Sequence, residues 1–174
     1  MPVRAESIGD IMLPLSDSTI RASFVNATRK ELNDLALPTG LDEIDWTKLD
    51  YLGWRDRKNP RRAFVVIPVD GSPVGVMLRQ AEATPRTRAQ CSWCRDVHLP
   101  NDVVFFSARR SGAGGRNGNT VGTLVCAEFE CSANVRKTPP VAYIGFDVDA
   151  ARSERIESLR MRAAGFAAEV LQGD

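Results

Sequence analysis

Two short stretches decide the fold: CSWC at residues 91–94 and CAEFEC at residues 126–131. Between them they hold every cysteine of the chain: Cys91, Cys94, Cys126 and Cys131. A two-residue spacer lets a tight turn aim two thiolates at one point, and Zn²⁺ prefers four such soft ligands in a tetrahedron. The spacing C-x2-C, then 31 residues, then C-x4-C therefore predicts one zinc site that uses all four cysteines.

The sequence around the cysteines predicts a treble-clef zinc finger at about residues 88–140. Two strands, at 103–109 and 120–126, follow the first cysteine pair, and a helix follows the second strand. Cys126 then ends a strand and Cys131 lies in the first helical turn, where the helix dipole favours negative charge. Four thiolates close the coordination shell, so we expect the zinc to be structural.

Other interpretations of the cysteines are weaker. Unrelated buried cysteines would not form two matched pairs, and no βαβ pattern surrounds the first pair as in a thioredoxin-like redox site. His98, the only histidine, offers an alternative ligand, but its place after the first pair favours a role at the hairpin entry. Arg95 and Arg136 carry positive charge near the predicted thiolates. With one histidine and no paired carboxylates, we predict that the protein is not an enzyme.

Composition fits a protein with a substantial core. The chain has 174 residues, of which 43% are hydrophobic. Its longest apolar run, residues 63–69, is far shorter than the ~18 residues of a membrane span. The first residues contain no apolar stretch of the length that a secretory signal needs. We therefore expect a cytoplasmic protein with no membrane partner, where two disulfides are a poor account of four cysteines.

The charge is balanced overall but unevenly distributed. Residues 53–140 carry fourteen basic against seven acidic side chains, a net charge of +7, whereas residues 1–52 carry −4 and residues 141–174 carry −2. Arginine provides 19 of the 23 cationic residues, and its planar donor fork suits phosphate and carboxylate. Two interpretations stay open: a surface that faces RNA or an acidic protein, and a coding bias toward arginine.

The N-terminal third combines a helix with irregular structure. Apolar residues at helical spacing predict a helix at about 18–36, which Pro38 and Gly40 end. Residues 41–54 are expected to form a short helical or irregular piece whose two tryptophans pack into the core. The polar, proline-broken segment 55–62 is expected to be an exposed loop.

Strand and helix patterns complete an α+β fold with antiparallel hairpins. Two β-rich runs, at 63–69 and 74–80, flank an Asp-Gly-Ser turn and predict a hairpin. Steps of three and four between apolar residues predict an amphipathic C-terminal helix at about 149–171. Docking of this helix on the protein's own sheet is favoured over self-association, so we expect a monomer. We predict an N-terminal extension at 1–17 and a single α+β domain at 18–171.

A loop rich in glycine and arginine, RSGAGGRNGN at residues 110–119, joins the two strands between the cysteine pairs. Its glycines allow close approach to a partner, and long loops in compact domains are often functional. No Gly-Lys-Ser/Thr follows, so it is not a Walker A loop. A mobile loop with incidental arginines is the alternative. The residues that we expect to contact a partner lie on this loop and after the last cysteine: Arg109, Arg110, Gly115, Arg116, Asn117, Arg136 and Lys137.

Two phenylalanines lie on the strand that enters this loop. Phe105 and Phe106 alternate faces of the strand, so one of them is a candidate apolar anchor for a protein partner. Core packing is the favoured interpretation for both.

The motifs together resemble a known family. CSWCRDVH at 91–98, the run from FFSARR to SANVR at 105–136, and WTKLDYLGWRDRKNPRRAFVV at 46–66 look like the C-terminal treble-clef zinc-finger domain of elongation factor G-binding proteins, the fusidic-acid resistance type. The resemblance covers about residues 18–165. It implies that the four cysteines are zinc ligands, that the protein binds the translocase elongation factor G, and that it promotes release of this factor from the ribosome.

Two functions follow for testing. The first is a non-catalytic, zinc-stabilised protein that binds elongation factor G. The second is direct binding to the ribosome or ribosomal RNA, in which the Arg-rich loop and residues 55–62 contact phosphate; this binding would weaken steeply with salt.

Overall fold

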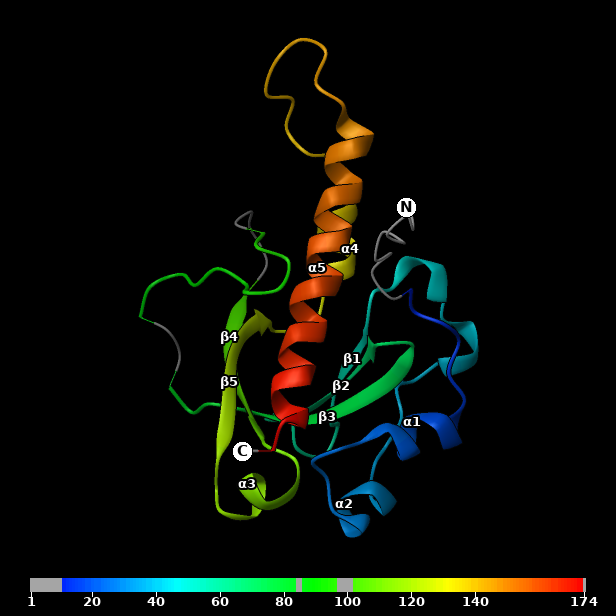
Figure 1. The fold of residues 1–174 in the computed structure, drawn as a ribbon, viewed down its shortest axis with the longest axis vertical. Helices are drawn as coiled ribbons and strands as arrows, with labels where there is room; N and C mark the ends of the chain where they lie inside the picture. The colour runs from blue at the N-terminus through cyan, green and yellow to red at the C-terminus, as the bar shows by residue number, and fades with distance from the viewer. Residues whose placement is uncertain (1–10, 84–85, 97–101, 174) are drawn as a thin grey trace, which may run out of the picture.

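The computed structural model describes residues 11–83, 86–96 and 102–173, and it contains one five-stranded antiparallel sheet (Figure 1). The strands lie in chain order: β1 (Leu52–Arg55), β2 (Arg62–Val69), β3 (Ser72–Gln80), β4 (Val103–Arg109) and β5 (Thr120–Cys126). The helices are α1 (Asp17–Ser23), α2 (Arg29–Asn33), α3 (Gly112–Arg116), α4 (Cys131–Arg136) and α5 (Val148–Leu171), with short 3-10 turns at Leu41–Glu43 and Trp46–Lys48. Strands and helices are segregated, so the fold is α+β.

The predicted hairpins are confirmed. β2 and β3 pair along their whole length around a turn in which Asp70 and Gly71 have φ values of 50° and 79°. β4 and β5 pair from Val103↔Cys126 to Arg109↔Thr120. Strand β1 was not predicted, because four residues are too few to show the alternation of a strand. It pairs with β2 and extends the sheet at that edge.

The helix predicted at 18–36 is wrong as a single element, since the structure divides it into α1 and α2. Between them the chain is extended: Phe24 forms an isolated bridge with Gly75, and the Val25 N–H donates to the Gly75 carbonyl at 3.0 Å. Thr28 then starts a new helix with a capping box, in which its hydroxyl accepts from the Glu31 N–H and the Glu31 carboxylate accepts from the Thr28 N–H. Tertiary pairing with β3 outweighs the local helical pattern.

Two other local predictions need correction. The sequence predicts a helix over the whole segment 127–137, but the chain becomes helical only at Cys131, because Phe129 has a φ of 58° and its N–H donates to the Cys126 carbonyl in a turn. The glycine- and arginine-rich loop contains the one-turn helix α3. A short helix gives this segment a fixed shape.

Helix α5 lies across one face of the sheet, as predicted for the C-terminal helix (Figure 1). Its buried side chains join β2 and β3 in the main core: Leu159, Ala163, Phe166, Ala167 and Val170. A second cluster, on the opposite face, combines Met12, Ile20, Leu52 and Val66, and both Trp46 and Trp54 pack against it as predicted. Across the described residues, no helix has the length and apolar character that a membrane span requires.

Candidate metal centre and partner loop

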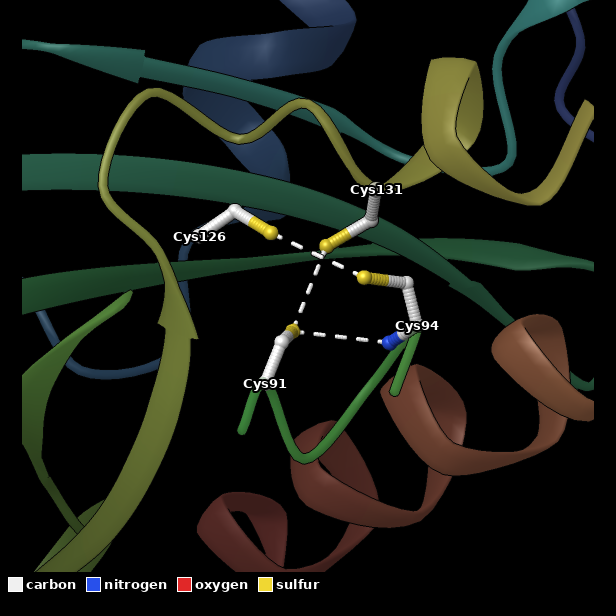
Figure 2. A group of neighbouring side chains, drawn as sticks. All are labelled: Cys91, Cys94, Cys126 and Cys131. Atoms are coloured by element: carbon white, nitrogen blue, oxygen red, sulfur yellow. Dashed lines mark hydrogen bonds between the residues drawn. The ribbon is translucent and has the colours of Figure 1, made fainter. Parts of the chain in front are cut away.

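The four cysteine side chains point toward one another (Figure 2), at the end of β5 that lies away from the loop joining β4 and β5. Cys91 and Cys94 come from a turn, Cys126 ends β5, and Cys131 opens α4, as predicted. The four sulfur atoms all lie within 4.8 Å of one another and are buried. The sulfurs of Cys91 and Cys131 are 3.6 Å apart, as are those of Cys94 and Cys126. A tetrahedron with Zn–S distances of ~2.3 Å places sulfurs about 3.8 Å apart, so the residues fit a zinc ion.

Hydrogen-bond donors around the sulfurs also fit thiolates. The backbone N–H groups of Trp93 and Cys94 both donate to the Cys91 sulfur at 3.4 Å. The buried amide of Asn134 donates to the sulfurs of Cys126, at 3.5 Å, and Cys94, at 3.7 Å. We did not predict Asn134 from the sequence, although its position three residues after Cys131 places both on one helix face. These donors compensate sulfur charge and orient the ligands.

The cluster is electrostatically incomplete without a cation. Hydrogen bonding with Cys126, and then with the other two cysteines, lowers the pKa of Cys91 far below its usual range. Contact with Cys126, Cys91 and Cys94, together with burial, raises the pKa of Cys131 well above its usual range. Four neighbouring thiols therefore do not ionise together by themselves, and a divalent metal ion replaces their protons on binding.

Aromatic side chains tie the metal centre to α5. Trp93, between the first two cysteines, is buried and donates from Nε1 to the Thr123 hydroxyl at 3.1 Å. Its ring meets Tyr51 edge-on at 5.0 Å and Phe166 of α5 at 5.5 Å. Burial, followed by the charge of nearby Cys131, raises the pKa of Tyr51 well above its usual range, so the phenol stays neutral. The centre is thus continuous with the main core.

A buried carboxylate holds α4 and α5 together beside the metal centre. Asp50 accepts hydrogen bonds from Arg136 at 2.6 and 3.1 Å and from Arg160 at 2.9 Å. The Asp50 side chain is fully buried, whereas the two arginines are partly exposed. Arg136, predicted near the thiolates and as a partner contact, therefore directs its charge to Asp50. This pair could not be predicted from the sequence, because 86 residues separate Asp50 from Arg136.

The structure brings four of the predicted partner residues to one pocket of about 290 Å³. Arg109, Arg110, Gly115 and Arg116 line it, together with residues 25–28. Gly115 is required there, because a Cβ at this position would lie 1.8 Å from the Arg110 carbonyl oxygen. Asn117 caps the C-terminus of α3 through its backbone N–H. The arginines of the loop are therefore carried by a segment with regular structure, the short helix α3.

The cations at this pocket differ in their partners. Arg109 donates to Glu31 at 3.0 Å, and Arg110 donates to the Glu169 backbone carbonyl at 2.7 Å. The Arg116 side chain is exposed and makes no hydrogen bond or ion pair with any residue that the structure describes. Arg116 is the most available cation of the loop.

Arg136 and Lys137 are not at this pocket. α3 precedes β5 and α4 follows it, so these two residues lie at the opposite end of that strand. Lys137 lies 3.6 Å from the buried carboxylate of Asp96. A role for them in partner contact would require a second contact region. His98, the alternative metal ligand, lies outside the described residues.

A cysteine knuckle, a β-hairpin and a helix that begins at the fourth cysteine define a treble-clef zinc finger. The sequence model of the FBP C-terminal treble-clef zinc-finger family matches residues 19–170, so the chain belongs to this family. Zinc is accordingly its metal.

The fold is similar to a solved structure titled "Structure of the fusidic acid resistance protein FusC". The TM-score is 0.53 at 18% sequence identity, and the match covers 72% of this chain and 54% of that chain. At this identity the likeness shows a shared fold, and this chain spans about half the length of that neighbour. No curated protein matches the sequence.

Proposed function

We propose that this chain is a non-catalytic, zinc-stabilised protein that binds translation elongation factor G as a monomer and promotes its release from the ribosome. Membership of the FBP C-terminal zinc-finger family and the fold shared with a fusidic acid resistance protein support this proposal. The motifs that resemble elongation factor G-binding proteins include the cysteines and the loop itself. Four thiolates leave zinc no open position for a substrate, which supports a non-catalytic role.

The observation that carries the proposal is the pocket formed by the loop. Arg109, Arg110, Gly115 and Arg116 were predicted from the sequence as partner contacts. All four line this pocket. The Arg116 side chain is exposed at the end of the short helix α3. A carboxylate of an acidic partner surface complements this arrangement, and a fixed loop loses little conformational entropy on binding.

The test is an affinity measurement between the purified zinc-loaded chain and purified elongation factor G at moderate salt. We expect a micromolar or tighter complex that Arg116→Glu weakens about tenfold or more through charge reversal. Lys48→Glu, the same change at an exposed lysine on a different element, is the matched control and should bind like the wild type. Absence of a complex with the wild-type protein at micromolar concentrations would refute the proposal.

A further inference from the structure

The sheet face opposite α5 carries an open row of polar residues across four strands. Register places Arg62 opposite Arg79, Arg79 opposite Ser107, and Ser107 opposite Gly122. Arg79 and Ser107 alternate with the core residues of their strands, so their side chains point away from α5. This row, with Phe105 beside it, is here called the outer sheet face.

A cavity opens in this face where two strands separate. β3 and β4 pair only at Arg79↔Ser107 and Gln80↔Phe106. Beyond that point the side chain of Asn26 fills the fork: its amide donates to the carbonyls of Met77 and Arg109, each at 3.0 Å, and its oxygen accepts from the Met77 N–H at 2.8 Å. The cavity next to this fork has a volume of about 310 Å³, which is within the range of ligand-binding sites.

The charge of the cavity is positive. Three arginines line it against one carboxylate: Arg62, Arg79, Arg109 and Glu31. Arg62 is neutralised by Asp56, which accepts from its Nε at 2.8 Å, and Arg109 is paired with Glu31. The side chain of Arg79 is exposed and makes no hydrogen bond or ion pair within the described part of the chain. Because Arg62 and Arg109 are already paired with carboxylates of the protein, Arg79 is the cation of this cavity that is open to an anion from outside.

An exposed aromatic ring lies on the same sheet face as this charge. Phe105 is 40% exposed, so core packing is wrong for it, whereas Phe106 is buried as expected. The Phe105 ring covers the α-carbon of Gly122, since a Cβ there would lie 2.3 Å from the ring. Phe105 precedes Ser107 by two residues on the same face, about 7 Å away. The ring lies over β5 and Arg79 is on β3, two strands away, so this face offers an aromatic surface about 10 Å from an arginine.

We propose that the outer sheet face binds single-stranded RNA, with a base stacked on Phe105 and a phosphate held by Arg79. Aromatic rings on an open sheet take unpaired bases of any sequence, and arginine forks hold the backbone. Ser107 and Thr120, which line the cavity, supply hydroxyl groups of the kind that contact a ribose. The cavity shares Arg109 with the loop pocket, but Arg79 and Phe105 do not line that pocket and Arg116 does not line this cavity, so variants at these residues test the inference independently of the proposed function.

The test uses the full zinc-loaded chain and a fluorescein-labelled oligouridine of about ten nucleotides, followed by fluorescence anisotropy. We expect binding that weakens steeply between ~50 and ~200 mM salt. Arg79→Glu and Phe105→Ala should each weaken it about tenfold, and Phe105→Tyr should retain it because the ring remains. Arg155→Glu, on the helix that covers the opposite face, is the control for charge reversal and should change binding less than twofold.

Three results would overturn the inference. One is no anisotropy change up to about 100 μM protein at low salt. Another is equal weakening by Arg155→Glu and Arg79→Glu, which would indicate diffuse attraction rather than this face. The third is displacement of the RNA by an oligoglutamate peptide at equal concentration, which would make the face a site for acidic protein segments. Circular dichroism and zinc content of each variant distinguish lost contact from lost fold.

Discussion

Buried polar residues join parts of the chain that sequence patterns do not connect. The cysteines were predictable because their spacing is local and their chemistry is specific. The roles of Asn26 and Asp50 were not predictable, because their hydrogen-bond partners lie 51 to 110 residues away in the sequence and an isolated polar residue does not indicate its partner. Each stands in a gap between elements: Asn26 between β3 and β4, and Asp50 between α4 and α5.

Asn26→Ala should lower the free energy of unfolding by about 2–3 kcal/mol, because the Met77 N–H and the carbonyls of Met77 and Arg109 lose their partner in a buried fork. Urea unfolding of the zinc-loaded protein measures this loss. Asn33→Ala, an exposed position on α2, is the control and should change stability by less than about 0.5 kcal/mol. Equal effects of the two variants would contradict a bridging role for Asn26.

Asp56 gives a dependence of stability on pH. Burial raises its pKa, but hydrogen bonds from Arg62 and from the Lys58 N–H outweigh this and lower the pKa below the usual value of 3.8. A lowered folded-state pKa adds stability above the unfolded pKa, and this stability is lost as the pH falls below 3.8 through the folded value.

Asp56→Asn should therefore be less stable than the wild type by about 1 kcal/mol at pH 7, and the difference should shrink as the pH falls from 5 to 3. Measuring the difference at each pH separates this carboxylate from the effect of acid on the cysteines, which both proteins share. A difference that stays constant with pH would show that the carboxylate charge contributes nothing.

At the scale of elements, strands were predicted better than helices. The hairpins of β2 with β3 and β4 with β5 show clear runs of β-branched residues around turn signals, and α5 shows a long helical period. The split between α1 and α2 comes from pairing of Phe24 with Gly75, a contact across 51 residues that overrides the local pattern. α3 was missed because a single turn with three glycines carries no helical signal; the close approach of Gly115 to Arg110 helps to fix its shape.

Alanine substitutions at two glycines test whether local helix propensity or tertiary contact determines the residue at each position. Gly165 lies inside α5 with nothing within 4 Å of an added Cβ, so Gly165→Ala should raise the free energy of unfolding by about 0.5–1 kcal/mol. Gly115→Ala should lower it, since the new Cβ would lie 1.8 Å from the Arg110 carbonyl oxygen. Denaturant unfolding of both variants gives the comparison. If both shift stability in the same direction, close contact at α3 is not what requires glycine.

For the whole molecule, the metal centre and the main core form one unit. The cysteines, Trp93 and α5 share a single hydrophobic cluster, so metal binding and packing support each other. The sequence has a nearly balanced total charge, with a basic segment at residues 53–140 between two acidic ends. The structure distributes that basic segment over two neighbouring surfaces that share Arg109, the loop pocket and the outer sheet face, which only the strand register could reveal.

Cys126→Ser should abolish stoichiometric zinc binding and unfold the middle of the chain, because metal binding in small zinc domains is coupled to folding. Zinc content by mass spectrometry and circular dichroism measure both effects. Ser92→Ala, an exposed change within the same cysteine turn, is the matched control and should retain zinc and fold. A folded Cys126→Ser protein without zinc would contradict a structural metal.

Isothermal titration calorimetry of the zinc-loaded chain with purified elongation factor G at moderate salt tests directly whether this protein binds the factor. We expect a saturable one-to-one complex with micromolar or tighter affinity, weakened by Arg116→Glu and unchanged by Lys48→Glu. Absence of binding heat at about 50 μM protein, with zinc bound and the fold intact, would contradict the central claim that this zinc finger binds the factor.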